Sequence, residues 1–161
     1  MQAHGKVLKY GDNVDTDVII PARYLNSFDA KELASHAMVD IDPTFVERVN
    51  DGDLIVAGKN FGCGSSREQA TSVLKALGIK AGIAKSFARI FYRNSINIGL
   101  PVIVCKELYD HVEDGGGADL DLSAGTVTVN GQVFSCTKLP EYMQNILNAG
   151  GLIASLNKEE A

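Results

Sequence analysis

Residues 54–78, LIVAGKNFGCGSSREQATSVLKALG, decide the fold class of this chain. The first four, 54–57, are continuously apolar, which is typical of a strand that is buried on both faces of a sheet. A glycine-rich turn follows, and from about Ser66 onward apolar residues recur at helical spacing until Gly78. The stretch therefore predicts a buried strand, a tight turn and a helix.

The residues that follow repeat this alternation. Two short apolar runs, 81–84 and 102–104, predict further strands. Between them lies a segment that is expected to form a helix and to bury Phe87, Ile90 and Phe91. Strands and helices that alternate through the middle of a chain favour a partly parallel α/β sheet.

The two ends of the chain complete the expected architecture. Near the C-terminus, short strand-like segments flank Asn130-Gly131, which predicts an antiparallel hairpin with a tight turn. The other predicted elements are extended segments at 7–10, 18–20, 120–122, 126–129 and 132–134, and helices at 30–38, 44–49, 141–148 and 152–157. With no linker or repeat along it, the chain 1–161 is expected to form one α/β domain with a β-rich side layer and flanking helices.

Charge and cysteine content exclude several classes of protein. The 161 residues carry 15 Lys+Arg against 20 Asp+Glu, a formal net charge of −5, and show no basic stripe for nucleic acid. No apolar run approaches the roughly 20 residues of a membrane span, so we expect a soluble, cytoplasmic protein. The three cysteines are widely spaced, which predicts neither a disulfide framework nor a metal or iron–sulfur site on this chain.

The turn before the helix has two interpretations, and the residues alone leave both open. In the first, Ser65 caps the helix and Glu68 returns to the Ser65 amide, as in a capping box. Gly62 and Gly64 would then supply only permissive backbone angles. In the second, the N–H groups at the helix N-terminus and the guanidinium of Arg67 form an anion site, with the Ser65 hydroxyl placed for proton transfer.

Three motifs resemble the swivelling domain of the aconitase superfamily. They are KNFGCGSSRE at 59–68, GDNVDTDVIIPARYL at 11–25 and KSFARI at 85–90. The likeness extends over most of the chain to about Cys105, and a chain that holds only this domain is similar to the small subunits of two-subunit family members. The resemblance implies a swivelling-type β/β/α fold.

The resemblance also implies a reaction and a partner. Family members interconvert hydroxy acids by dehydration and rehydration, and a separate large subunit holds a [4Fe–4S] cluster that binds the hydroxyl and a carboxylate of the substrate. The expected cofactor therefore lies on the partner, with no metal on this chain. Self-association of the isolated chain stays open.

Roles for individual residues follow from their motif positions. Ser65, the first motif serine, is expected to be the base that removes the proton next to a substrate carboxylate. Ser66 and Arg67 are expected to bind substrate carboxylate. Arg23 and Asn26 lie in a loop that, in this family, faces the variable group of the substrate. The residues expected to support the site are Asp15, Asp17, Gly62 and Gly64.

Alternatives remain for the substrate and for the class of function. Homoaconitase-like relatives carry an arginine after Tyr24-Leu25, and its absence here favours a less charged substrate such as isopropylmalate over homoaconitate; citramalate and dimethylmalate are further alternatives. Gln69 stands where many relatives have histidine, a departure that bears on substrate choice. A non-catalytic carboxylate-binding module and a thiol enzyme using Cys63 are hypotheses from other classes.

Overall fold

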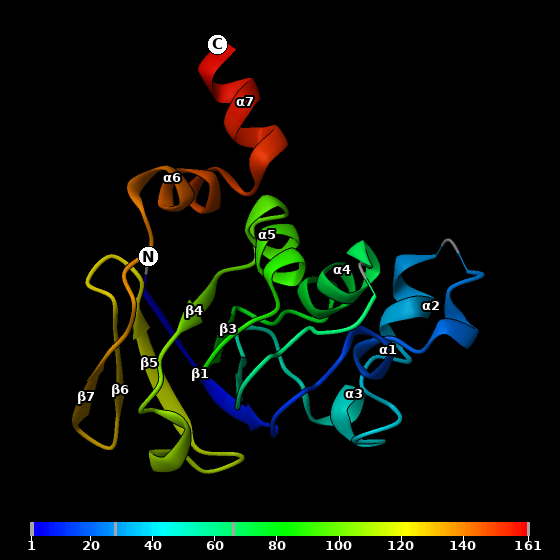
Figure 1. Ribbon diagram of the computed structural model, residues 1–161, viewed down its shortest axis with the longest axis horizontal. Coiled ribbons are helices and arrows are strands. Elements are labelled where there is room, and N and C mark those ends of the chain that lie inside the picture. The colour runs from blue at the N-terminus through cyan, green and yellow to red at the C-terminus, as the bar shows by residue number, and fades with distance from the viewer. Residues whose placement is uncertain (1, 28, 66, 161) are drawn as a thin grey trace.

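The computed structural model describes residues 2–27, 29–65 and 67–160 of the chain. In this part, seven strands form one sheet in the order β4-β3-β2-β1-β5-β6-β7 (Figure 1). The strands are β1 (Gln2–Lys9), β2 (Leu54–Ala57), β3 (Ala81–Ala84), β4 (Val102–Val104), β5 (Gly117–Asp121), β6 (Thr126–Val129) and β7 (Gln132–Ser135). The helices are α1 (Thr16–Ile19), η1 (Ala22–Tyr24), α2 (Ala30–Ala34), α3 (Phe45–Arg48), α4 (Glu68–Ala76), α5 (Arg89–Asn97), η2 (Tyr109–His111), α6 (Glu141–Ala149) and α7 (Leu152–Glu160).

The sheet has a parallel half and an antiparallel half that meet at β1. Strands β1 to β4 pair in parallel, with Leu54 opposite Ala81 and Ile83 opposite Ile103. On its other side β1 pairs antiparallel with β5, and β6 and β7 continue the alternation. Asn130 and Gly131 both have positive φ, 51° and 80°, as a type I′ hairpin turn between β6 and β7 requires. The predicted α/β class with a partly parallel sheet is confirmed.

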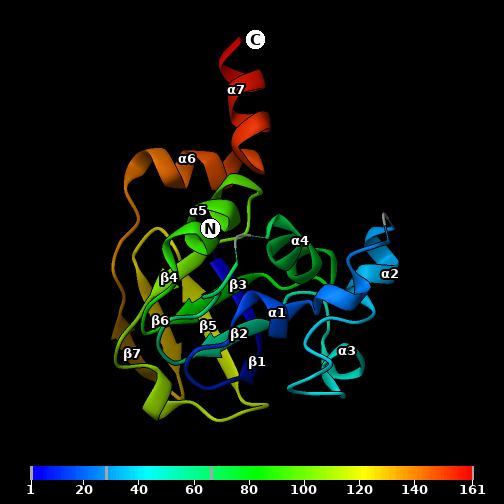
Figure 2. The same ribbon diagram turned by 45° about the vertical axis from the view of Figure 1, so that its right-hand side comes forward.

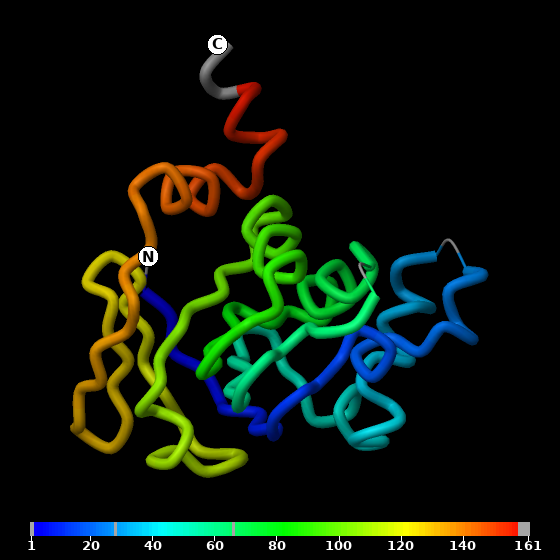
Figure 3. The backbone as a smooth tube through the Cα atoms, viewed as in Figure 1, coloured from blue at the N-terminus to red at the C-terminus, as the bar shows by residue number. Residues whose placement is uncertain are grey.

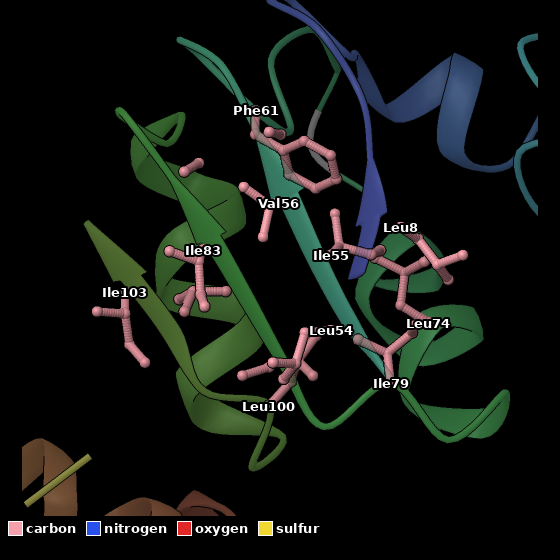
Figure 4. Packing of buried hydrophobic residues seen from close by; sticks show 14 of the residues in the cluster. Leu8, Leu54, Ile55, Val56, Phe61, Leu74, Ile79, Ile83, Leu100 and Ile103 are labelled. Atoms are coloured by element: carbon pink, nitrogen blue, oxygen red, sulfur yellow. The ribbon is translucent and has the colours of Figure 1, made fainter. Parts of the chain in front are cut away.

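The apolar runs of the sequence form the interior of the parallel half. Every residue of β2 and β3 is buried, as expected for strands that are covered on both faces. Helix α4 turns its apolar side toward this sheet, and Figure 4 shows Leu74 of α4 beside Ile55 and Leu8. Full burial of such a side chain stabilises the fold by about 1.5–3 kcal/mol, so this contact helps to hold α4 against the sheet.

The prediction of an extended segment at 18–20 is wrong, because this segment belongs largely to helix α1. The Asp15 carboxylate accepts a hydrogen bond of 2.8 Å from the Val18 amide and so caps the helix. The apolar run suggested a strand, but an Asp three residues before Val18 is also a helix-start signal. The capping hydrogen bond that Asp15 accepts therefore determines the local structure, although Val18, Ile19 and Ile20 are β-branched and favour a strand.

Two further expectations about helices also fail. The helix predicted for 30–38 ends at Ala34, and Met38 adopts φ 61° while its amide donates to the Ile19 carbonyl. A tertiary hydrogen bond to α1 thus replaces the helical one. Phe87 lies before α5, and Ile90 is 50% exposed, so of the three residues expected inside this helix only Phe91 is both helical and buried.

The C-terminal helices lie apart from the sheet. Helix α6 packs near α5, and α7 projects away from the body of the molecule (Figures 2 and 3). Ile153 on α7 is largely exposed. Among the described residues, no helix combines the length and the apolar character that crossing a membrane requires.

A partly buried network links the N-terminal strand to α3. Asp42 accepts hydrogen bonds from the Tyr10 hydroxyl (2.7 Å) and from Arg48 Nη1 (2.9 Å), and Arg48 Nη2 binds Asp114 at 2.7 Å. Burial alone would raise the pKa of the Asp42 carboxyl, but hydrogen bonds from Thr44 and Tyr10 together outweigh it and lower the pKa. The folded state therefore holds Asp42 in its charged form more strongly than the unfolded chain does.

We expect Asp42→Asn to cost about 1–3 kcal/mol of unfolding free energy at pH 7, through the loss of charged hydrogen bonds. A lowered folded-state pKa contributes stability that is fully present above the unfolded value of about 3.9 and is lost as the pH falls through the folded value. The mutant should therefore lose less stability than the parent protein between pH 5 and 3. Urea unfolding at several pH values measures this, with the exposed Glu113→Gln as control. An equally steep acid loss in Asp42→Asn would contradict the argument.

Candidate functional site

The glycine-rich turn between β2 and α4 lies against the segment before α1. The Gly62 amide donates to the Val14 carbonyl (2.7 Å), and the Thr16 amide donates to the Cys63 carbonyl (2.8 Å). The Thr16 hydroxyl donates to the Ser65 carbonyl at 2.7 Å. Two motifs that are far apart in the sequence are thereby held side by side at the same end of the sheet.

Both glycines of the turn adopt backbone angles that favour glycine. Gly62 has φ 84° and Gly64 has φ 91°, in the left-handed region. A Cβ on Gly62 would lie 2.1 Å from Cγ of Phe91 on α5, so the turn and α5 approach more closely than any side chain allows. A Cβ on Gly64 would lie 3.4 Å from Cβ of Asp15, an ordinary contact. The turn therefore reaches its position only with glycine at 62.

Ser65 lies at a shallow depression of about 190 Å³ where two helices begin. Helix α4 starts at Glu68, just after the turn, and α5 starts at Arg89 on the opposite wall. Both helix N-termini present amide groups and the positive end of a helix dipole, which favours an anion. The depression is lined by Thr16, Gly62, Gly64, Ser65, Arg67, Ala88, Arg89, Ile90, Phe91 and Asn94.

The capping-box interpretation of the turn is wrong. Helix α4 begins at Glu68, its N-cap residue is Arg67, and the Arg67 side chain makes no capping hydrogen bond. Ser65 lies before the cap position, and its side chain is exposed at the depression. The hydroxyl of Ser65 is therefore available to a ligand there.

Arg67 is held at the edge of the depression by contacts to the α1 segment. Its Nη1 donates to Asp17 Oδ1 at 3.0 Å and to the Ile20 carbonyl at 3.3 Å. Asp17 also accepts from the Ala22 amide, and that bond, with the Arg67 bond second, lowers the pKa of the Asp17 carboxyl. Both contacts use the same guanidinium nitrogen. The second terminal nitrogen can therefore meet a carboxylate oxygen.

The structure does not bring Arg23 and Asn26 into the depression. Arg23 pairs with Asp40 through two hydrogen bonds of 2.9 and 2.5 Å and lies over the Tyr24 ring, 4.7 Å from its centroid. Asn26 is exposed in the turn that follows η1. In the isolated chain these two residues belong to a neighbouring surface. Ser66, the remaining sequence candidate, lies outside the described residues.

Three residues that sequence reasoning did not single out line the depression. Thr16 lies between the two aspartates of the N-terminal motif, and Arg89 lies in the KSFARI motif. Asn94 follows one turn further along α5. The sequence did contain a signal for Arg89, since this residue belongs to the third motif. A positive charge there favours binding of an anion.

The environment of Cys63 disfavours a thiolate nucleophile. Burial raises the pKa of the Cys63 thiol, and the Asp15 charge raises it further. A reactive thiolate needs the opposite setting, with a lowered pKa. Separately, within the described residues no three His, Cys, Asp or Glu side chains converge as metal ligands.

Comparison with known proteins relates this geometry to a family. The family described as "Aconitase C-terminal domain" matches residues 21–107. The chain is 56% identical over 161 residues to the 3-isopropylmalate dehydratase small subunit of Lachnoclostridium phytofermentans, covering 99% of this chain and 98% of that one. It is 54% identical over 162 residues to the 2,3-dimethylmalate dehydratase small subunit of Eubacterium barkeri, covering 99% of each.

A solved structure agrees with these sequence relations. The crystal structure of 3-isopropylmalate dehydratase from Methanocaldococcus jannaschii is similar with a TM-score of 0.94 and 48% identity, covering 99% of this chain and 96% of that one. The shared fold therefore extends over the parallel half, the antiparallel half and the C-terminal helices.

Proposed function

Because the chain belongs to the aconitase C-terminal domain family, whose dehydratase small subunits it matches along nearly its whole length, we propose that it is the small subunit of a 3-isopropylmalate dehydratase. The enzyme is a hydro-lyase that interconverts 2- and 3-isopropylmalate by dehydration and rehydration, within leucine biosynthesis. The observation that carries the proposal is that Ser65 and Arg67 both line a depression bordered by the N-termini of two helices.

The partner in this proposal is a large subunit. We propose that this subunit carries the [4Fe–4S] cluster, which would act as a Lewis acid toward the substrate hydroxyl. Ser65 is exposed in the isolated chain, so a partner that covers the depression is needed to exclude water from it. The whole chain 1–161 would act as one swivelling domain that closes on the partner, in the cytoplasm.

The proposed chemistry of this chain centres on Ser65. Its oxygen would accept the proton from the carbon next to a substrate carboxylate. A serine hydroxyl is a weak base, so the negative oxygen must be stabilised by donors that are already in place. The amide groups at the starts of α4 and α5 are such donors. Ser66, as the next motif residue, would add a contact to the substrate carboxylate.

Arg67 would bind a substrate carboxylate through its unpaired nitrogen, with Asp17 fixing the orientation of the guanidinium at 3.0 Å. Asp15 acts one step further back, because it caps α1 and thereby places Asp17. Arg23 and Asn26 would contact the variable part of the substrate only once the partner is bound, since both lie outside the depression in the isolated chain. Closure of this chain on the partner would thus bring Arg23 and Asn26 to the substrate, and would add selectivity for its variable group after its carboxylate is bound.

A second candidate substrate is 2,3-dimethylmalate. The small subunit of 2,3-dimethylmalate dehydratase is 54% identical to this chain, against 56% for the isopropylmalate relative. Identity at this level does not separate the two substrates. Both carry two carboxylates and differ in their alkyl groups, so the same Ser65 and Arg67 geometry serves either.

The first experiment reconstitutes the chain with a cluster-loaded large subunit. We expect no turnover from the chain alone, turnover from the assembled enzyme, and at least about a tenfold preference for isopropylmalate over dimethylmalate, as differential burial of an alkyl group allows. Rates on both substrates are measured in parallel. Robust turnover by the isolated chain would overturn the two-subunit proposal, and a preference for dimethylmalate would select the second candidate.

We expect Arg67→Lys to raise KM about 10- to 100-fold, because an ammonium group lacks the planar fork with which Arg67 holds Asp17 through one nitrogen and offers the other to a substrate carboxylate. A charged group remains at the site, so assembly should persist. Steady-state kinetics on the assembled enzyme measure the change. The matched control is Arg93→Lys on the exposed side of α5, outside the depression. If the two variants show the same KM, Arg67 does not bind substrate.

A further inference from the structure

The end of β4 and the residues at and just after the end of β7 lie side by side, at what we call the seam of the sheet. Cys105 directly follows β4, and Cys136 directly follows β7, at opposite ends of the strand order. The sheet curls so that the Thr137 amide donates to the Val104 carbonyl at 2.9 Å. In Figure 2 the stretch after β7 runs along the outside of the sheet toward α6. The curl therefore places residues that are far apart in the sequence beside each other.

The hydrogen bond between Thr137 and Val104 places Cys105 and Cys136 next to each other across the seam. Strands β1 to β4 are parallel and β5 to β7 alternate in direction, so β7 runs antiparallel to β4. The Cys105 amide donates to Ala84 and the Cys136 amide to Gly125, so both amides point away from the seam. In an antiparallel pair, residues without hydrogen bonds between them have Cα atoms about 4.5 Å apart. That spacing lies within the range of about 4.4–6.8 Å that a disulfide spans.

Side-chain contacts support the same arrangement. Both cysteines are free thiols, and the Cys136 thiol hydrogen bonds to the Cys105 sulfur. The Cys105 thiol also contacts the Ser135 carbonyl, at 3.7 Å. The Cys136 bond, aided by the Leu108 and Glu107 amides, lowers the pKa of Cys105 to about 7. The lowered pKa favours the thiolate of Cys105, which is the reactive form of the thiol.

We propose that Cys105 and Cys136 form an oxidation-sensitive dithiol that closes to an intramolecular disulfide across the seam of the sheet. The oxidant by class is a hydroperoxide. Its O–O bond breaks, the S–S bond forms, and the two thiol hydrogens leave in water, so that two thiols and one hydrogen peroxide give one disulfide and two waters. Cys105 is 2% exposed and Cys136 is half-buried, so a small oxidant is required.

The bond would tie the parallel half of the sheet to the antiparallel half. The loop it closes, 105–136, contains β5, β6 and β7. A cross-link over a loop of this length restricts the unfolded chain, which should raise the thermal midpoint by roughly 5–10 °C. Thiol reductants should reverse the change. The proposal stands independently of the substrate assigned above.

The test treats the purified full-length chain with hydrogen peroxide and then alkylates the remaining thiols under denaturing conditions. We expect one alkyl group, on Cys63, and a chain about 2 Da lighter than the unmodified chain with that group added, since two hydrogens leave when the disulfide forms; a tryptic peptide pair should join Cys105 to Cys136. Cys63 should be recovered alkylated and serves as the internal control. Melting curves with and without reductant should show the expected rise in midpoint.

Variants make the assignment specific. Cys63→Ser should form the disulfide as the parent does, and Cys136→Ser should instead accumulate oxygen adducts on Cys105. Cys105→Ser should likewise form no disulfide and should accumulate oxygen adducts on Cys136. If this variant fails to fold, the results for Cys136→Ser and Cys63→Ser are sufficient to test the proposal. A cross-link that involves Cys63, a disulfide between two chains, or oxidation of methionine before any thiol is lost would overturn the proposal.

Discussion

We expect Ser65→Ala to lower the turnover of the assembled enzyme by about 10²–10⁴-fold, the range that loss of a general base produces. The reason is that Ser65 is exposed at the depression where the helices α4 and α5 begin. Arg67 and the helix amides remain in the mutant, so the affinity for substrate should change little. Turnover and substrate affinity are measured with the same large subunit as for the parent protein.

Stability separates this catalytic role from a structural one. The Ser65 side chain does not cap α4, so the mutation should cost less than about 0.5 kcal/mol of unfolding free energy. Ser72→Ala is the matched control, because Ser72 is an exposed serine on the same helix whose hydroxyl donates only to the Glu68 carbonyl. It should leave turnover unchanged. Near-normal turnover in a folded Ser65→Ala enzyme would show that Ser65 is not the general base.

The parallel half of the fold could be predicted from the sequence. The boundaries of β2, β3 and β4 match the apolar runs 54–57, 81–84 and 102–104. The reason is that these strands are buried on both faces, so hydrophobicity alone marks where they begin and end. The hairpin turn at Asn130-Gly131 was equally readable, because few residues tolerate two consecutive positive φ angles.

The failures lie where a contact from elsewhere in the chain decides the local structure. Helix 30–38 stops at Ala34 because Met38 bonds to the Ile19 carbonyl, a contact that no local pattern encodes. Ile90 keeps helical spacing but faces the depression and not the core. Local periodicity identifies an apolar face, but it does not tell which faces the fold leaves open.

The candidate site shows the same division. Ser65, Arg67 and the two glycines lie within six consecutive residues, 62–67, so one turn brings them together and the sequence revealed them as a group. The pairing of Arg23 with Asp40 depends on how η1 lies against the following segment. The contribution of α5 depends on its approach to Gly62. Contacts between separate elements therefore had to come from the structure.

The close approach of α5 to Gly62 leads to the second prediction with a large expected effect. We expect Gly62→Ala to destabilise the chain by about 2–5 kcal/mol, as the sum of a left-handed backbone cost of roughly 1–2 kcal/mol and an overpacking cost of roughly 1–3 kcal/mol. The new Cβ would lie 2.1 Å from Cγ of Phe91, whose ring is buried against Phe61 and Phe87. Because Phe91 is only 3% exposed and is packed against these two rings, we expect part of the strain to move the turn itself. Ser65 and Arg67 would move with it, so turnover should fall as well.

A series of three glycines separates the two costs. Gly115 has φ 86° and open space around its missing Cβ, so Gly115→Ala should cost only the backbone term, about 1 kcal/mol. Gly64 has φ 91° and an ordinary contact at 3.4 Å, so Gly64→Ala should fall close to Gly115→Ala. Urea unfolding of all three at one pH gives the comparison. If Gly62→Ala is no worse than Gly115→Ala, the close approach of α5 to the turn does not constrain the site. The positioning of Ser65 must then rest on the bond that the Thr16 hydroxyl donates to the Ser65 carbonyl and on the bond that the Gly62 amide donates to the Val14 carbonyl.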